Sequence, residues 1–172
     1  MARGDLATAF HEAGHVAAAG SRGLKIYSAT IDPTPEFRGH TLHANPLRGV
    51  RLNLSLARVR DRAESAIVVY LAGPEAQQRH NPRSWRAHHG ASDFKQAFDL
   101  AMGLSTSGEA AHAYLDWLTV VARDEIAALW PQVEMVAQAL VARRTLAAAE
   151  VKALLARAPD MSASVFQLGE MK

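Results

Sequence analysis

The chain has 172 residues, enough for one domain with a full hydrophobic core but not for a second enzyme domain. Lys and Arg total 19 against 17 Asp and Glu, and because the cations are spread along the chain, a nucleic-acid-binding stripe is not expected. The absence of Cys excludes disulfides and thiolate ligands, so a metal site would need the eight His or the carboxylates.

The first predicted element is a helix over residues 6–19, a stretch without proline. Asp5 is a candidate N-cap in front of it, and residues 20–23, Gly-Ser-Arg-Gly, form a stop signal behind it. The helix carries His-Glu-Ala-Gly-His at residues 11–15, which matches the His-Glu-x-x-His pattern of zinc-binding helices.

This motif can place two imidazoles and one carboxylate around a single ion. Successive helical residues are rotated by about 100°, so His11 and His15 lie roughly 40° apart and one turn from each other. Glu12 falls to the side of the ion, where it is better placed to accept the proton of a zinc-bound water than to bind the metal. The motif therefore predicts metal-assisted hydrolysis with Glu12 as the general base.

Two short strands are predicted next, over residues 25–31 and 38–44, each followed by a proline-containing turn. Together they would form a small hairpin or sheet. If the second strand is a sheet edge that faces the cleft, an extended substrate could add to it through backbone hydrogen bonds. On that hypothesis, replacing Gly39 or Thr41 with Pro should raise KM.

A longer helix is predicted over residues 54–78, where apolar residues recur at intervals of three and four. Gly73 and Pro74 could interrupt this helix. Residues 79–90 show no periodicity, which predicts a loop.

The C-terminal part of the sequence predicts helices almost throughout. Their ranges are 93–104, 108–130, 131–143 and 146–158. Ser92 and Thr145 are candidate N-caps, and Pro131 suits the first turn of a helix. Trp117 and Trp130, at helical spacing with leucines, indicate core or interface anchors rather than a cofactor site.

A catalytic zinc site needs a third protein ligand and an open fourth position. Asp93 is the best-placed candidate because it starts a helix directly after a loop, although the helix dipole also favours an Asp there without any metal. His88 and His89, in the preceding loop, are alternative ligands for a rearranged or inhibited site. His40 and His43, in the second strand, are candidate donors to a tetrahedral intermediate, but a surface His is the commoner case.

The sequence contains no segment suited to a membrane or to nucleotide binding. Its longest strongly apolar run, residues 66–73, is too short to cross a bilayer, and no apolar signal segment is found at the N-terminus. The Gly-x-x-x-x-Gly-Lys-Ser/Thr motif of a P-loop is also missing. We therefore expect a cytoplasmic protein without an ATPase of its own.

Four segments, spread between residues 10 and 151, form a recognisable set. They are residues 10–15 (F-H-E-A-G-H), 67–78 (I-V-V-Y-L-A-G-P-E-A-Q-Q), 90–101 (G-A-S-D-F-K-Q-A-F-D-L-A), and 130–151, which begins W-P and includes R-T-L and E-V. In this order they resemble the peptidase domain of FtsH-type membrane proteases, the ATP-dependent AAA proteases. The resemblance implies His11, His15 and Asp93 as zinc ligands and Glu12 as the general base.

The sequence departs from that family at several positions. The Asn that precedes the ligand Asp is missing, the two Glu after the alanine are Gln77 and Gln78, and the family Arg is not kept at Gly73-Pro74. These changes bear on substrate preference more than on metal binding. Because the P-loop is missing, the resemblance implies a stand-alone peptidase domain that does not unfold its substrates.

The implied fold is mainly α (α+β), a zincin-like metallopeptidase domain with a small β-hairpin or sheet and a helical C-terminal bundle. We expect a single domain over residues 1–172, with a zinc-site half at 1–104, a helical half at 105–160 and a tail at 161–172. The expected function is that of a zinc-dependent, ATP-independent endopeptidase. It would hydrolyse peptide bonds in unfolded or flexible polypeptides.

An alternative is a catalytically idle metal-binding or interaction domain derived from a peptidase. The absent ATPase and the loop at 79–90, which could cover the site, favour this alternative, whereas an intact Glu12 argues against it. The expected partner is a polypeptide substrate, with no nucleic acid and no membrane segment. The sequence leaves open a homo-oligomer or a separate partner protein.

Overall fold

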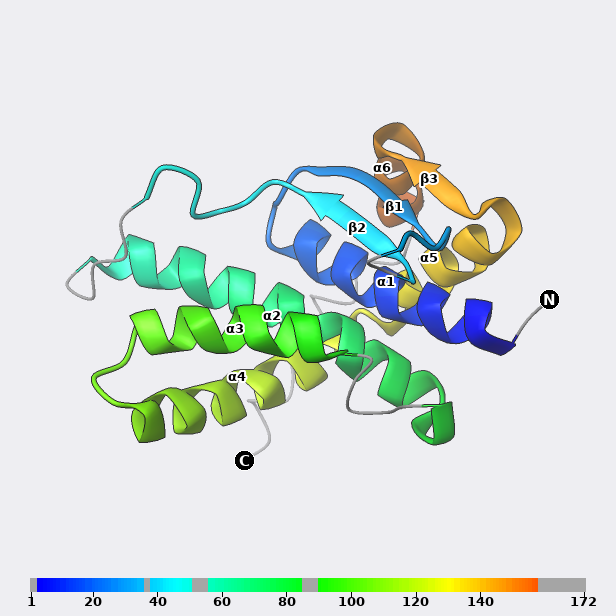
Figure 1. Cartoon of the computed structure of the whole chain (residues 1–172). Coiled ribbons are helices and arrows are strands. Elements are labelled where there is room, and N and C mark those ends of the chain that lie inside the picture. Colours follow the sequence, from blue (N-terminus) through cyan, green and yellow to red (C-terminus); the bar gives the residue numbers. More distant parts are fainter. Residues whose placement is uncertain (1–2, 36–37, 51–55, 85–89, 158–172) are drawn as a thin grey trace, which may run out of the picture.

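The structure, a computed structural model, describes residues 3–35, 38–50, 56–84 and 90–157. These residues form six α-helices, one short 3-10 helix and a three-stranded antiparallel sheet, an α+β arrangement that is mainly helical (Figure 1). The helices are α1 (Arg3–Ser21), α2 (Ala57–His80), α3 (Ala91–Gly103), α4 (Gly108–Ala128), α5 (Trp130–Arg143) and α6 (Ala148–Arg157). The remaining elements are β1 (Ile26–Thr30), β2 (His40–His43), β3 (Thr145–Ala147) and the 3-10 helix η1 (Pro82–Ser84).

Helices α1 and α2 pack directly against each other at the centre of the molecule. Small residues allow their backbones to approach closely. A Cβ atom added to Gly14 of α1 would lie 2.4 Å from the carbonyl oxygen of Ala72 and 2.7 Å from the Cβ of Ala76, both in α2. This close approach lets the side chain of His15, next to Gly14, reach the backbone of α2.

The later helices are distributed over this central pair. Helix α5 packs against α1, whereas α3 and α4 pack along α2 and against each other (Figure 1). One buried apolar cluster accordingly joins α1, α5 and the sheet, and a second joins α2, α3 and α4. The helices predicted for residues 105–160 therefore pack on the elements formed by residues 1–104 and complete the core.

The sheet has the strand order β2-β1-β3 and lies against α1, which contacts both β1 and β2. In β2, Thr41 and His43 are half-buried, whereas His40 and Leu42 are exposed. This alternation follows from the pleat, which points successive side chains to opposite faces. Thr41 and His43 therefore share the face of β2 that looks towards α1.

The third strand was not predicted from the sequence. Thr145 is not the N-cap of a helix over residues 146–158 but pairs with Thr30 of β1, and α6 begins only at Ala148. The hydroxyls of these two threonines lie 2.7 Å apart although 115 positions separate them in the sequence. A three-residue strand has no readable periodicity, so only its distant partner reveals it.

Two further predicted N-caps are also wrong. Helix α1 begins at Arg3, which puts Asp5 in its first turn, and α3 begins at Ala91 after Gly90, which puts Ser92 inside the helix. The predicted position of Pro131 in a first helical turn is confirmed.

The second helix differs from its predicted form at both ends and in the middle. Pro74 lies inside α2 without ending it, and the helix continues to His80, into the predicted loop. Residues 54 and 55, His88, His89 and the predicted tail at 161–172 lie outside the described residues. Within the described residues, no helix is long and apolar enough to cross a membrane.

The two tryptophans have different environments. Trp130 is partly buried and stacks on Phe10, with 5.6 Å between the ring centroids, as expected of a core anchor. Trp117 is 52% exposed and stacks on Tyr114, so it is not a core residue. Its role as an interface anchor stays a prediction.

Candidate metal centre

The three predicted metal ligands lie together in the structure. His11 and His15 project from α1 and are 8% and 7% exposed, and Asp93 comes from the first turn of α3. One candidate ligand atom from each residue lies within 4.8 Å of the others. The Nε2 atom of His11 is 3.1 Å from Asp93 Oδ2 and 3.1 Å from His15 Nε2. Among the described residues, this is a buried group that could hold a metal ion.

The other nitrogen of each imidazole is engaged by α2. His15 Nδ1 donates to the backbone carbonyl of Val69 at 2.7 Å, and His11 Nδ1 lies 3.3 Å from Gln77 Oε1. A carbonyl oxygen can only accept, so each Nδ1 carries a proton in these contacts. The Nε2 atom of each neutral ring therefore presents a lone pair, as it must to bind a metal.

Two imidazole lone pairs and a carboxylate thus converge with no donor between them, which favours a bound cation. In the absence of metal, that cation is a proton. Burial by itself lowers the pKa of His15, but the charge and hydrogen bond of Asp93 outweigh it and raise this pKa to about 9. Burial likewise opposes the charged form of Asp93, yet His15 and His11 hold the pKa of that carboxyl well below its usual range.

Gly73 makes room for both imidazoles. A Cβ atom there would lie 2.4 Å from His15 Nε2 and 2.9 Å from His11 Nε2. From the sequence, Gly73 could interrupt the predicted helix, but α2 runs through it without a break. The available signal was a glycine inside a helical pattern, which often marks a close approach of another group.

Glu12 lies beside the group formed by His11, His15 and Asp93 and is not part of it. Its side chain is 5% exposed, and its Oε2 accepts a hydrogen bond of 2.7 Å from the hydroxyl of Thr41 in β2. Gly39, just before β2, approaches the other oxygen so closely that a Cβ would lie 2.7 Å from Oε1. The flanking position expected from helix geometry therefore comes with two contacts that the sequence did not reveal.

His43 lies on the same face of β2 as Thr41, and its role as a donor stays a prediction. Its Nδ1 donates to the carbonyl of Ala44 at 3.0 Å, so its neutral ring presents a lone pair at Nε2. Burial lowers the pKa of His43, and a positive charge on His15 would lower it further. His40, the other candidate donor, lies on the exposed face of the strand, and its role likewise stays a prediction.

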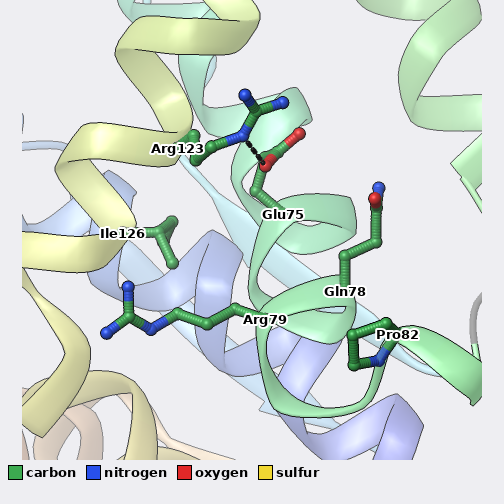
Figure 2. A pocket seen from close by; sticks show the side chains of 6 residues that line it. All are labelled: Glu75, Gln78, Arg79, Pro82, Arg123 and Ile126. Carbon is green, nitrogen blue, oxygen red and sulfur yellow. Dashed lines mark hydrogen bonds and ion pairs between the residues drawn. The ribbon is translucent and has the colours of Figure 1, made fainter.

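A cavity of about 370 Å³ lies on the other side of α2. It is lined by Glu75, Gln78, Arg79, Pro82, Arg123 and Ile126 (Figure 2). At about 100° per residue, the α2 residues that line it lie roughly opposite the helix face that carries Gly73 and Gln77. Arg123 Nε donates to Glu75 Oε2 at 3.0 Å in this cavity, which contains none of the metal group.

Comparisons with known proteins do not assign a family. No protein-family model matches the chain, and no curated protein matches it. The resemblance to the FtsH-type peptidase domain therefore stays a prediction that rests on the four sequence segments.

Proposed function

We propose that this protein is a zinc-dependent endopeptidase that cleaves unfolded or flexible polypeptides without ATP. The observation that carries this proposal is the convergence of two imidazole lone pairs and one carboxylate next to Glu12. Two His and one carboxylate form a common ligand set of catalytic zinc, which keeps a fourth position for water or substrate. Zinc is the metal most compatible with a tetrahedral site of this composition.

In the proposed reaction, His11, His15 and Asp93 would hold the metal. When bound, zinc supplies Lewis acidity, which polarises a carbonyl and lowers the pKa of a water molecule. Glu12 then accepts the proton of the attacking water and returns it to the leaving nitrogen. Val69 and Gln77 keep the two imidazoles in the metal-binding tautomer, because each accepts from an Nδ1.

The edge strand β2 is the proposed docking site for the substrate. Within the described residues, β2 pairs with β1 on one side and with no strand on the other. An extended polypeptide could add there with little dependence on its sequence. Proline at Gly39 is a poor test, because it would also press on Glu12. N-methylation of alternate backbone amides in a peptide substrate tests the same idea and leaves the protein unchanged; a raised KM is expected.

The decisive experiment compares zinc content and cleavage of an unfolded protein for wild type, Glu12→Gln and Asp93→Ala. Glu12→Gln should bind zinc as wild type does but cleave about 100-fold to 10,000-fold more slowly, the usual range for loss of a general base. Asp93→Ala should lose both zinc and cleavage. Wild-type cleavage by Glu12→Gln would overturn the proposal, and full zinc binding by Asp93→Ala would remove Asp93 from the ligand set.

Burial of the site favours a second candidate function, that of an idle metal-binding or interaction domain. Glu12 is 5% exposed and both histidines are below 9%, so the described conformation gives a substrate little access. If wild type binds one zinc per chain and cleaves no unfolded protein under any condition, this function replaces the first.

A further inference from the structure

The contact between Thr41 and Glu12 links the sheet to the metal helix. The hydroxyl of Thr41 is 2.7 Å from Glu12 Oε2 and 3.3 Å from the Glu12 backbone oxygen. Both oxygens accept only, and a hydroxyl has a single proton. The shorter contact is also the charge-assisted one when the carboxylate is ionised, so the proton is directed at Oε2.

The same strand segment also bounds the second oxygen of Glu12. Gly39 and Thr41 are two residues apart and therefore meet α1 from one face of the strand. A Cβ on Gly39 would lie 2.7 Å from Oε1 and 2.9 Å from Cγ of Glu12. The carboxylate is thus held by a donor on one side and by close backbone packing on the other.

The position of Thr41 is in turn set by the central strand. Thr41 pairs with Ala29 of β1, which is fully buried. On its other side, β2 is the sheet edge at which the substrate would add. A displacement of β2 would therefore be transmitted to Glu12 through one hydroxyl.

We propose that Thr41 is a positioning residue that aligns Glu12 with the attacking water. It holds Oε2 and makes the alignment of the base depend on the placement of the substrate-binding strand. This role rests on the proposed peptidase function. Without the hydroxyl, the carboxylate can rotate away from its productive orientation, and a misplacement of about 1 Å is enough to slow a reaction about 100-fold.

The test compares Thr41→Val, which keeps the shape and the β-branch but removes the donor, with Thr41→Ser, which keeps the donor. Thr119→Val is the matched control, because its hydroxyl bonds to Leu115 within α4 and away from the site. We expect Thr41→Val to lower kcat about 10-fold to 100-fold while KM and zinc affinity change less than about twofold. Thr41→Ser should recover most of the rate, and Thr119→Val should behave as wild type.

A second readout needs neither metal nor activity. In the metal-free protein, the losses in free energy of unfolding for Thr41→Val and Glu12→Ala should not add up in the double variant, because each substitution removes the same contact. If Thr41→Val does not fold, Thr41→Ala replaces it in both measurements.

The possible results separate the two proposals. Unchanged kcat in Thr41→Val, or equal loss in Thr41→Val and Thr41→Ser, would overturn the role of Thr41 and leave the peptidase intact. Wild type that binds zinc without cleaving would overturn the peptidase function and this role with it.

Discussion

The two faces of α2 differ in how strongly a substitution on them should disturb the neighbouring side chains. One face meets the imidazoles of α1 with a backbone carbonyl at Val69, a missing side chain at Gly73 and a neutral amide at Gln77. The other face carries charged side chains around an open cavity of about 370 Å³. The face of α2 with the least side-chain chemistry therefore places the strictest conditions on the candidate metal site.

The physical reason is the different origin of the two sets of contacts. A metal-binding imidazole needs an acceptor at Nδ1 and free space at Nε2, and here the backbone and small residues of α2 supply both. The ion pair between Glu75 and Arg123 involves a guanidinium side chain that is 61% exposed. Water can replace much of such an interaction, so its loss is tolerated.

The largest expected effect comes from Gly73→Ala. The added methyl would lie 2.4 Å from His15 Nε2, so one imidazole must leave the site. Zinc affinity should fall more than 100-fold, because losing even an outer partner of a ligand costs about 10-fold to 100-fold. Gly108→Ala is the control, since a Cβ there meets no atom within 4 Å. Zinc titration with a competing chelator measures the affinity of both variants. An unchanged zinc affinity in Gly73→Ala would contradict the close packing of Gly73 against the two imidazoles.

A smaller effect is expected from removing the partner of His11. Gln77→Leu should lower zinc affinity about 10-fold to 100-fold, because the ring loses the acceptor that fixes its tautomer. Gln77→Glu keeps an acceptor and should retain zinc binding. Equal losses in both variants would show that Gln77 acts through packing alone, since only Leu removes the acceptor.

The metal-free protein should lose stability as the pH rises from about 6.5 to about 9. The pKa of His15 is raised in the folded state from 6.5 to about 9. The protonated ring therefore contributes its full share to the free energy of unfolding below pH 6.5, and this contribution is lost as the pH rises to about 9. Asp93 has a lowered pKa, and its contribution is lost as the pH falls below about 4. Melting temperatures across this range, with and without Asp93→Asn, measure the effect. A flat profile between pH 6.5 and 9 in the wild type would argue against the His15–Asp93 pairing.

The smallest effect is expected on the cavity face. Arg123→Gln should reduce the free energy of unfolding by about 1 kcal/mol, at the upper end for a partly exposed ion pair, because Glu75 is more buried than its partner. Zinc affinity should not change. If the zinc affinity of Arg123→Gln fell as far as that of Gln77→Leu, the two faces of α2 would not be independent.

Local sequence patterns were enough to predict most helices and the α1 side of the candidate metal site. Helical periodicity and the His-Glu-x-x-His spacing depend on hydrogen bonds between residues four apart, so they can be read locally. For that reason His11, Glu12 and His15 have the predicted relation to one another. The prediction of a mainly α fold with a small sheet is confirmed for the same reason.

The surroundings of those three residues depend on contacts between segments that are distant in the sequence. Asp93 and Gln77 reach His11 across 82 and 66 positions of sequence, and Thr41 reaches Glu12 across 29. Such contacts depend on how α2, α3 and β2 pack against α1, and no local pattern encodes that packing. Family resemblance could single out Asp93. The requirement for glycine at position 73 and the hydroxyl beside Glu12 became visible only when the helices and the sheet were brought together.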